Sequence, residues 1–453
     1  MRIPNLLATP RGRLFAFFAL YVCEGIPAGF TGTAVATQMR RQGLDPAVIG
    51  GFLSVLYIPW AFKWALGPFV DVVTVEHWGR RRFWILLTQT MMAATVAAAM
   101  FVDLRTHLLL FTSVVFVLNL FSAAQDVAID ALAVNTLRAE ERGSANGLMF
   151  GGSFLGNAVG GAGVLLLTPW IGFRSTFLLV AGAILAVTLL IAVPLRETVA
   201  AGAIRAARGS LQDVARAIGE FAREAASAFT RSRAALAAVC LALLPMGPYA
   251  LSFSVQTNLS VELGLNDHQV GLLSLLSGTI AAAFCVLGGW LSDRYGRRRS
   301  LAAFIVGMAI PTVLLAIVMA RFGWWMPVDP LHANRPVPAP ELVALFWGLT
   351  LLYAVFNGLM FGAGTAIYMD VTDPKVAATQ FTAYMALCNV VYAYTPKWQG
   401  ISLVKLGYPA TLAIDTAFGL LCLLVIPLLT ARGPEHAEPA PGAAIPETVP
   451  LDP

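Results

Sequence analysis

The sequence predicts an all-α membrane protein, and three observations lead to that fold class. Of the 453 residues, 58% are hydrophobic and only 12% are charged, whereas soluble domains carry about 25% charged residues. The mean hydropathy of the chain is +0.74. Long apolar runs recur from end to end, and a helix of about 20 such residues crosses a hydrocarbon layer of about 30 Å.

Twelve of these runs are expected to form membrane spans, six in each half of the chain. The two groups of six predict two six-helix bundles, and the even number places both termini on one side of the membrane. The expected spans are residues 14–37, 47–70, 83–102, 108–133, 144–168, 173–194, 234–258, 269–291, 301–320, 342–369, 377–396 and 409–431.

The basic residues indicate which side that is. Of the 30 Lys and Arg residues, 21 fall in segments on the same side of the membrane as the N-terminus, 8 fall on the opposite side, and Lys63 lies within a span. Lys and Arg in short loops stay cytoplasmic, so both termini are expected in the cytoplasm. No basic patch interleaved with aromatic residues occurs, so no nucleic-acid partner is expected.

Cysteine and histidine usage bears on chemistry. The five cysteines lie inside apolar runs without the spacing of metal ligands, so neither a metal nor another cofactor is expected. The five histidines lie in loops or in the C-terminal tail. A membrane-embedded acyl transferase would need a catalytic group within the bilayer, so we expect a protein that is not an enzyme. A non-transporting sensor is a third possibility.

A charged turn occurs twice in the chain. The later copy, residues 289–299, reads Gly-Trp-Leu-Ser-Asp-Arg-Tyr-Gly-Arg-Arg-Arg, and the earlier copy has Gly67-Pro68-Phe69-Val70-Asp71 followed by Gly79-Arg80-Arg81-Arg82. Each copy lies between the second and third runs of its half, which predicts two repeats. The pattern Gly-x-x-x-Asp-Arg-x-Gly-Arg-Arg resembles the loop motif of the major facilitator superfamily. This resemblance implies the twelve-helix major facilitator fold, two six-helix bundles with inverted repeats.

Four segments are expected along the chain. Residues 1–195 form the N-terminal six-helix bundle, and residues 234–432 form the C-terminal one. Between them, residues 196–233 form a cytoplasmic linker, in which apolar residues at helical spacing predict an amphipathic helix. Residues 433–453 are rich in Pro, Ala and Glu and cannot bury an apolar face, so a disordered cytoplasmic tail is expected.

Three ionisable residues within the spans are candidates for proton coupling. A charge in a span costs about 2.5–3.5 kcal/mol on insertion scales, so such residues tend to face a cavity. By helix rise, Glu24, Lys63 and Asp126 lie roughly 12–15 Å from the inner ends of their helices, and we expect them to meet at a central cavity. A lysine between two carboxylates suits a proton switch. The alternative is a static ion pair that locks three helices together.

A second set of charges is expected to form a cytoplasmic gate, which latches the inner side when the outer side is open. Asp130 and Asp370 lie at the matching ends of the fourth and tenth expected spans, residues 108–133 and 342–369. The arginines of the two charged turns are their expected partners. The alternative is that these charges are simply placed at helix ends. The full set is Asp71, Arg80, Arg81, Arg82, Asp130, Asp293, Arg294, Arg297, Arg298 and Asp370.

Uncharged polar residues in the second half are candidates for solute contact, although hydrogen bonding between helices is the commoner role for any one of them. Asp415, a few residues into the last span, is expected at the membrane interface. The glycines of the fifth expected span, residues 144–168, predict close packing against a neighbouring helix; Gly152, Gly156 and Gly160 are among them. The solute-contact candidates are Tyr249, Gln256, Asn357, Gln380, Tyr384, Asn389 and Tyr392.

Several stretches resemble the AmpG-like transporters, the muropeptide-permease and acetyl-CoA-transporter family. The resemblance implies import of amphiphilic, often anionic solutes, such as anhydromuropeptides or acetyl-CoA. The fifth expected span also resembles a branch that imports siderophores, through the pattern Asn146-Gly147, Gly151-Gly152 and Gly160-Gly161. The AmpG-like stretches are Tyr21-Val22-Cys23-Glu24-Gly25-Ile26-Pro27, Pro59-Trp60-Ala61-Phe62-Lys63-Trp64 with Gly67-Pro68, Gln125-Asp126-Val127-Ala128-Ile129-Asp130 and Ala378-Thr379-Gln380-Phe381.

These observations predict a secondary active transporter driven by protons, and the resemblance implies that it imports an amphiphilic solute across the inner membrane of a bacterium. An anhydromuropeptide is the expected solute, and a siderophore or an acetyl-CoA-like anion is the alternative. Nothing in the sequence resembles a nucleotide site, which favours an ion gradient as the driving force. The expected partners are the small-molecule solute, the proton and the lipid bilayer, and the protein is expected to be a monomer.

Overall fold

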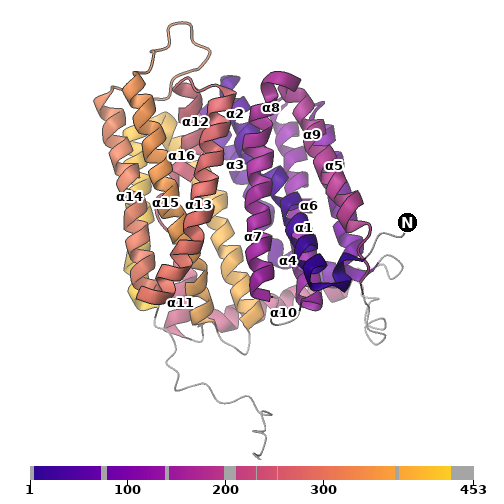
Figure 1. The fold of residues 1–453 in the computed structure, drawn as a ribbon. Coiled ribbons are helices and arrows are strands. Elements are labelled where there is room, and N and C mark those ends of the chain that lie inside the picture. Colours follow the sequence, from indigo (N-terminus) through magenta and orange to yellow (C-terminus); the bar gives the residue numbers. More distant parts are fainter. Residues whose placement is uncertain are drawn as a thin grey trace, which may run out of the picture.

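The structure is a computed structural model, and it describes residues 5–72, 79–137, 142–197, 211–230, 232–252, 254–372 and 377–429. Within these residues all regular structure is helical. Figure 1 shows two groups of long, roughly parallel helices side by side, the first coloured indigo to magenta and the second pink to yellow. The predicted tail, residues 433–453, and residues 198–210 of the predicted linker lie outside the described residues.

The first bundle contains six spans, four of which are interrupted by a bend or a π-helical turn. The third span begins only at Arg80, directly after the first charged turn. In chain order the elements are α1 (Pro10–Gly29), a π turn (Phe30–Val35) and α2 (Ala36–Arg41); α3 (Pro46–Ala61) and α4 (Lys63–Val72); α5 (Arg80–Ala99); α6 (Leu108–Thr136); α7 (Arg142–Ala158), a π turn (Val159–Gly163) and α8 (Val164–Ile171); and α9 (Phe173–Val187) with a π turn (Thr188–Ala192).

The second bundle ends in a helical hairpin. In chain order its elements are α11 (Arg233–Ala242) and α12 (Ser254–Glu262); α13 (Asp267–Tyr295); α14 (Arg297–Arg321); α15 (Pro340–Val371); and α16 (Ala377–Leu420) with the short α17 (Cys422–Val425). The backbone of α16 breaks at Gly407, whose φ is 78°. Ser402 and Thr411 are hydrogen-bonded across this break at 2.8 Å, so α16 contains two antiparallel spans.

These elements make twelve spans, as the sequence predicts. Among the described residues, eight helices are by themselves long and apolar enough to cross a membrane, and α3 with α4, bent by 42°, makes a ninth. The other three are α5, the broken pair α11 and α12, and the second leg of α16. The predicted fold class, an all-α membrane protein of two six-helix bundles, is confirmed.

The seventh span differs from the continuous run expected over residues 234–258. α11 ends at Ala242 and α12 begins at Ser254, and residues 243–252, here called the connector, are largely non-helical. Pro245 and Pro248 lack the N–H group that a helix requires, and Gly247 has a φ of 106°. The connector therefore follows from its local sequence.

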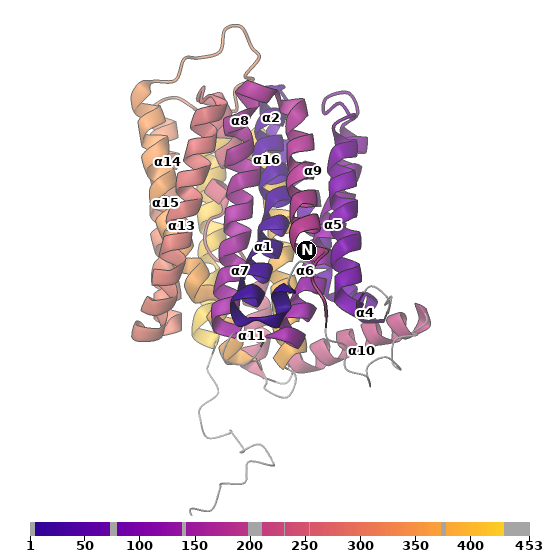
Figure 2. The ribbon, with the colours of Figure 1, turned by 45° about the vertical axis from the view of Figure 1, so that its right-hand side comes forward.

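Helix α10 (Leu211–Thr230) lies across one end of the two bundles, as Figure 2 shows. Its buried residues Val214, Ala225 and Ala228 recur at helical spacing, so it rests on the bundles by one apolar face. We call this end of the molecule the α10 end. The opposite end, at the tips of α2 and α12, is called the Arg40 end.

Helices α1 and α7 pack with their backbones almost in contact. A Cβ atom added at Gly156 would overlap the carbonyl oxygen of Val22 on α1, and Gly152 and Gly160 approach the same helix equally closely. Gly25 of α1 has the same relation to the backbone of α7. The close packing predicted from the glycines of the fifth span is confirmed.

Candidate functional site

A charged cluster lies at the bend of the second span. Phe62 has φ and ψ of −106° and 11°, which ends α3 and lets α4 start in a new direction with Lys63. The Nζ atom of Lys63 lies 2.8 Å from Oδ2 of Asp126 on α6. The Asp126 side chain is 5% exposed and that of Lys63 is 20% exposed, so the pair is largely removed from solvent.

Helix α1 adds two more groups to this cluster. The Tyr21 hydroxyl donates a hydrogen bond to Asp130, one helical turn beyond Asp126, and lies 3.5 Å from Oδ1 of Asp126. The buried carboxyl group of Glu24 interacts with that of Asp126, and its Oε2 atom has no hydrogen-bond partner among the described residues. The structure thus brings together Glu24, Lys63 and Asp126, as expected, and adds Tyr21 and Asp130.

The cluster faces a cavity of about 560 Å³ at the α10 end. The first bundle lines it with residues that include Lys63, Asp126 and Asp130, and the second bundle lines it with residues of α16. Helix α10 supplies a third wall, in which Phe221 stacks on Trp64 with 5.6 Å between ring centroids. The cavity is therefore built between the two bundles rather than inside one.

A second cavity, of about 380 Å³, has a lining without ionised side chains. Both bundles contribute to it, since Thr33, Tyr57 and Asn157 lie opposite residues of α12, α13, α15 and α16. Four of the seven solute-contact candidates are among its lining residues: Tyr249, Gln256, Asn357 and Tyr392. We call this the neutral cavity.

The other three solute-contact candidates tie helices together outside the lining of the neutral cavity. Gln380 donates to the carbonyl of Ala228 on α10 at 3.5 Å and, within α16, to the Tyr384 hydroxyl at 3.0 Å. Tyr384 donates to the carbonyl of Ala235 on α11 at 3.2 Å. Asn389 donates to the carbonyl of Trp60 at 3.2 Å, which joins α16 to α3. In this conformation these residues make the interhelical bonds that are the commoner role of polar groups in spans.

The second charged turn is held to its own bundle. Arg297 forms an ion pair with Asp370 and a weaker one, at 3.4 Å, with Asp293. The neighbouring Arg294 lies over the Trp290 ring, 5.4 Å from its centroid. Arg298, another arginine that was expected as a partner of Asp370, lines the cavity beside this pair. Because Arg297 and Asp370 belong to one bundle, their contact does not join the two bundles.

The first charged turn is also anchored within its bundle. The backbone N–H groups of Arg81 and Arg82 both donate to Oε1 of Glu197, and the Arg81 side chain donates to the Val70 carbonyl at 3.0 Å. Arg80 begins α5. The side chain of Asp71, another expected gate residue, lies outside the described residues. A role for either turn as a gate stays a prediction.

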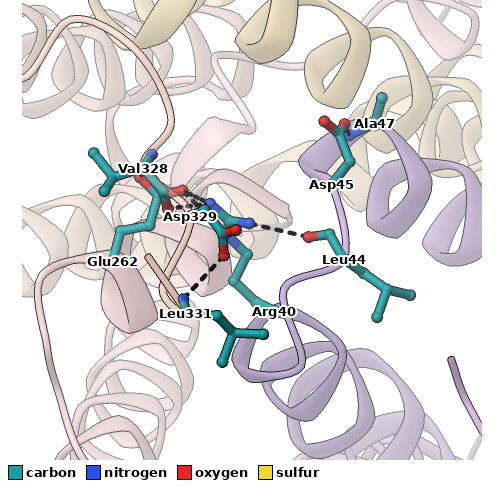
Figure 3. Close-up of polar contacts among 8 residues, drawn as sticks. All are labelled: Arg40, Leu44, Asp45, Ala47, Glu262, Val328, Asp329 and Leu331. Atoms are coloured by element: carbon teal, nitrogen blue, oxygen red, sulfur yellow. Dashed lines mark hydrogen bonds and ion pairs between the residues drawn. The ribbon is translucent and has the colours of Figure 1, made fainter. Parts of the chain in front are cut away.

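An ion pair that does join the bundles lies at the Arg40 end (Figure 3). Arg40 of α2 and Glu262 of α12 form an ion pair of 2.6 Å between Nη2 and Oε1, with side chains 3% and 0% exposed. Arg40 also donates to the carbonyls of Leu44 and Val328, and the Val328 N–H donates to Oε2 of Glu262 at 2.9 Å. Both carboxylate oxygens of Glu262 therefore have hydrogen-bond donors.

Two further contacts close the same end. Arg41 pairs with Asp267 at 2.7 Å, again between the bundles. The backbones of α3 and α16 touch where a Cβ atom at Gly50 would overlap the Pro396 carbonyl and one at Gly400 would overlap the Pro46 carbonyl. The bundles are thus sealed at the Arg40 end and parted by a charged cavity at the α10 end.

Glu262 was not among the expected site residues, and the partners of Asp415 were not predicted. Glu262 lies just beyond the expected span 234–258, and only its partner Arg40, 222 positions away, shows its role. Asp415 was expected at the membrane interface, and within the protein its side chain is 1% exposed and accepts hydrogen bonds from Ala250 and Gln399. Its span starts directly after the break at Gly407, close to the expected residue 409, so its depth in the membrane stays a prediction. A buried acid in a span was the available signal.

The fold and the cavity between bundles define a polytopic membrane transporter, and the chain belongs to the major facilitator superfamily. The family model described as Major Facilitator Superfamily matches residues 15–257 and again residues 237–453. Within the superfamily the chain is AmpG-like. It is 26% identical over 414 residues to the anhydromuropeptide permease of Escherichia coli K12, an alignment that covers 89% of this chain and 77% of that protein.

Other relatives agree with this placement. The chain is 24% identical over 417 residues to the putative transporter AmpG 4 of Rickettsia conorii, which covers 88% of this chain and 94% of that one. Among solved structures, the inward-open xylose transporter XylE from E. coli superposes with a TM-score of 0.63, and the nucleoside transporter NupG with 0.62. Both are 14% identical in sequence to this chain, and each superposition covers 93% of this chain. It also covers 98% of XylE and 100% of NupG, so the three proteins share one fold.

Proposed function

We propose that this protein is a proton-coupled importer of an amphiphilic solute in the inner membrane. The observation that carries the proposal is the ion pair of Lys63 and Asp126, which has two further carboxyl groups beside it and faces the cavity between the bundles. A transporter couples a solute to protons when both reach groups at the moving interface of its bundles.

The charge balance of the cluster favours proton exchange. Glu24, Asp126 and Asp130 provide three carboxyl groups, and Lys63 provides one ammonium group. With all four ionised, the cluster would carry a net charge of −2 away from bulk water. Such an excess is costly in a low-dielectric setting, and proton uptake relieves it. A change in the exposure of the cluster would therefore change its proton occupancy.

The two ends of the molecule support alternating access. The Arg40 end is sealed by a buried ion pair, whereas the α10 end has the charged cavity. The basic charged turns lie at the α10 end, which we therefore assign to the cytoplasm, together with both described ends of the chain. On this assignment the conformation faces inward, and the Arg40 end must part when the protein faces outward.

The two cavities support an amphiphilic solute. The neutral cavity offers tyrosine rings, amides and hydroxyls, whereas the cavity at the α10 end offers the charges of Lys63 and the carboxylates. A solute with a neutral polar part and an ionised part matches both linings. We take an anhydromuropeptide as the first candidate because the relative in E. coli is named as its permease.

Uptake into proteoliposomes tests the proposal. The purified protein is reconstituted, and radiolabelled anhydromuropeptide, ferric siderophore and acetyl-CoA are offered in turn, with an imposed pH gradient or with none. Accumulation of anhydromuropeptide that needs the gradient and collapses with a protonophore is the expected result. Uptake of one of the other two solutes instead would identify a different cargo. Equilibration unaffected by the gradient would reject proton coupling.

A further inference from the structure

The connector of the seventh span forms part of the neutral cavity wall. Tyr249, Leu251 and Ser252 all line that cavity, and all three belong to the connector. Because the connector lacks a continuous helical hydrogen-bond ladder, its position depends on groups from other helices. Tyr353 of α15 supplies two of the contacts that hold it, since its hydroxyl donates to the Pro248 carbonyl at 2.7 Å and is hydrogen-bonded to Ser252 at 2.8 Å.

The last span supplies a third support, the buried carboxylate of Asp415. Its Oδ2 atom accepts the N–H of Ala250 at 2.7 Å, and the N–H of Tyr249 also interacts with it. Its Oδ1 atom accepts from Nε2 of Gln399 at 2.8 Å. Among the described residues, no cationic side chain lies within ion-pair distance of Asp415. The connector N–H groups are thus its principal partners besides Gln399.

A glycine one turn further on seats the connector against the same helix. A Cβ atom added at Gly419 would overlap the backbone of Gly247 and Pro248. Asp415 and Gly419 lie on one face of the last span, because residues four apart are neighbours on a helix. The connector therefore rests on this face at two points, one polar and one steric.

We propose that Asp415 is a positioning residue for solute binding, which holds the connector by its N–H groups so that Tyr249, Leu251 and Ser252 face the neutral cavity. The proposal rests on the transport function proposed above. It assigns a role to an acid that lies outside the charged cluster and lines neither cavity. Loss of this support would let the connector move and would weaken solute binding without touching the proton-coupling groups.

The chain offers a conservative replacement at this position. In Asp415→Asn the remaining carbonyl oxygen can accept from Ala250, and the new amide group can donate to Oε1 of Gln399. That oxygen is buried and has no hydrogen-bond partner among the described residues, so a flipped Gln399 amide would keep the hydrogen bond between the two side chains. Asp415→Leu removes both acceptors and keeps the branching of the side chain at Cγ. Thr416→Val is the matched control, since Thr416 is also buried but donates only within its own helix.

Amide hydrogen exchange of the full chain in detergent tests the support directly. In Asp415→Leu, exchange over residues 243–252 is expected to rise by roughly tenfold or more, as loss of a hydrogen bond to a charged group implies. Asp415→Asn and Thr416→Val are expected to match the wild type. Unchanged exchange in Asp415→Leu would overturn the proposal, whether or not the protein transports any tested solute.

Uptake kinetics with radiolabelled anhydromuropeptide separate positioning from mere stability. Asp415→Leu is expected to raise KM by roughly tenfold with a smaller change in Vmax, and Asp415→Asn to restore the wild-type KM. If Asp415→Leu does not fold, Gly419→Ala, which keeps the acid and displaces the connector, is expected to raise KM in the same way. A fall in Vmax alone would show a structural role and overturn the proposal. Wild-type protein that takes up no solute would count against the proposed transport function. The hydrogen-exchange data would still decide whether Asp415 positions the connector.

Discussion

Arg40 and Glu262 form a fully buried ion pair that joins the two bundles at 2.6 Å. The two residues lie 222 positions apart, on α2 and α12, and the same carboxylate also accepts from the backbone of Val328. Breaking one partner of such a pair leaves an uncompensated charge without water. The pair therefore stabilises the conformation that is closed at the Arg40 end.

We expect Arg40→Met to lower the stability of the protein by about 3–5 kcal/mol, because Glu262 would remain buried and unpaired. The double variant Arg40→Met with Glu262→Leu should recover most of this loss, since both charges are then removed. Thermal unfolding in detergent measures the change. Arg41→Met is the control, because the Arg41–Asp267 side chains are 27% and 20% exposed and such pairs contribute about 1 kcal/mol or less. Equal losses in the two single variants would contradict this reasoning.

Asp126→Asn should abolish uphill uptake while it leaves folding intact. The amide keeps the shape of the side chain but cannot carry the charge that pairs with Lys63 or release a proton. Exchange of labelled solute across the membrane without a gradient should persist. Asp45→Asn is a suitable control, because Asp45 caps α3 outside the cluster and Asn caps a helix equally well. Undiminished gradient-driven accumulation in Asp126→Asn would remove Asp126 from the coupling site.

Gly156→Ala should destabilise the first bundle by about 1–3 kcal/mol, as overpacking of a tight interface does. The added methyl group would overlap the Val22 carbonyl, and backbone can yield only by moving the whole helix. Gly151→Ala, five residues earlier on α7, meets nothing within 4 Å and should not destabilise the protein, because Ala is favoured over Gly inside a helix by about 1 kcal/mol. Thermal unfolding of both variants checks the prediction, and similar values for the two would mean that the helices are not packed as described.

A charge swap can identify the partner of Asp370. Asp370→Arg places a second cation beside Arg297 and should reduce uptake, and the added change Arg297→Asp should restore part of it. The pairing of Asp370→Arg with Arg298→Asp should restore less, because Arg298 is not the residue paired with Asp370 in this conformation. Uptake rates normalised to the amount of folded protein compare the two. Better rescue by Arg298 would show that the contact differs in another conformation of the cycle.

Much of the fold could be predicted from the sequence because the bilayer imposes a local rule. Each span must satisfy its own backbone, so it appears as one apolar run, and the basic turns between runs give the order. The prediction of a continuous seventh span was wrong where Pro245, Gly247 and Pro248 interrupt the helix. These residues are a local signal, but the apolar composition of residues 243–252 concealed it.

The candidate site was predictable only in part. Lys63 and Asp126 could be placed together because both lie at a similar depth in the same half of the chain, and they form an ion pair. Depth alone could not separate Tyr249, which lines the neutral cavity, from Tyr384, which bonds to Ala235. Helix rotation decides such differences, and a long apolar helix shows little periodicity from which rotation could be inferred.

By itself the sequence determined the twelve spans, the duplicated charged turns and the set of acids that a bilayer would not tolerate without partners. The tertiary structure alone decided which distant groups meet: Arg40 with Glu262, Asp370 with Arg297, and Asp415 with the connector. The physical reason is that spans and turns follow from the exchange of water for hydrocarbon along the chain. Ion pairs and cavity walls instead follow from the packing of one helix on another, which no single segment encodes.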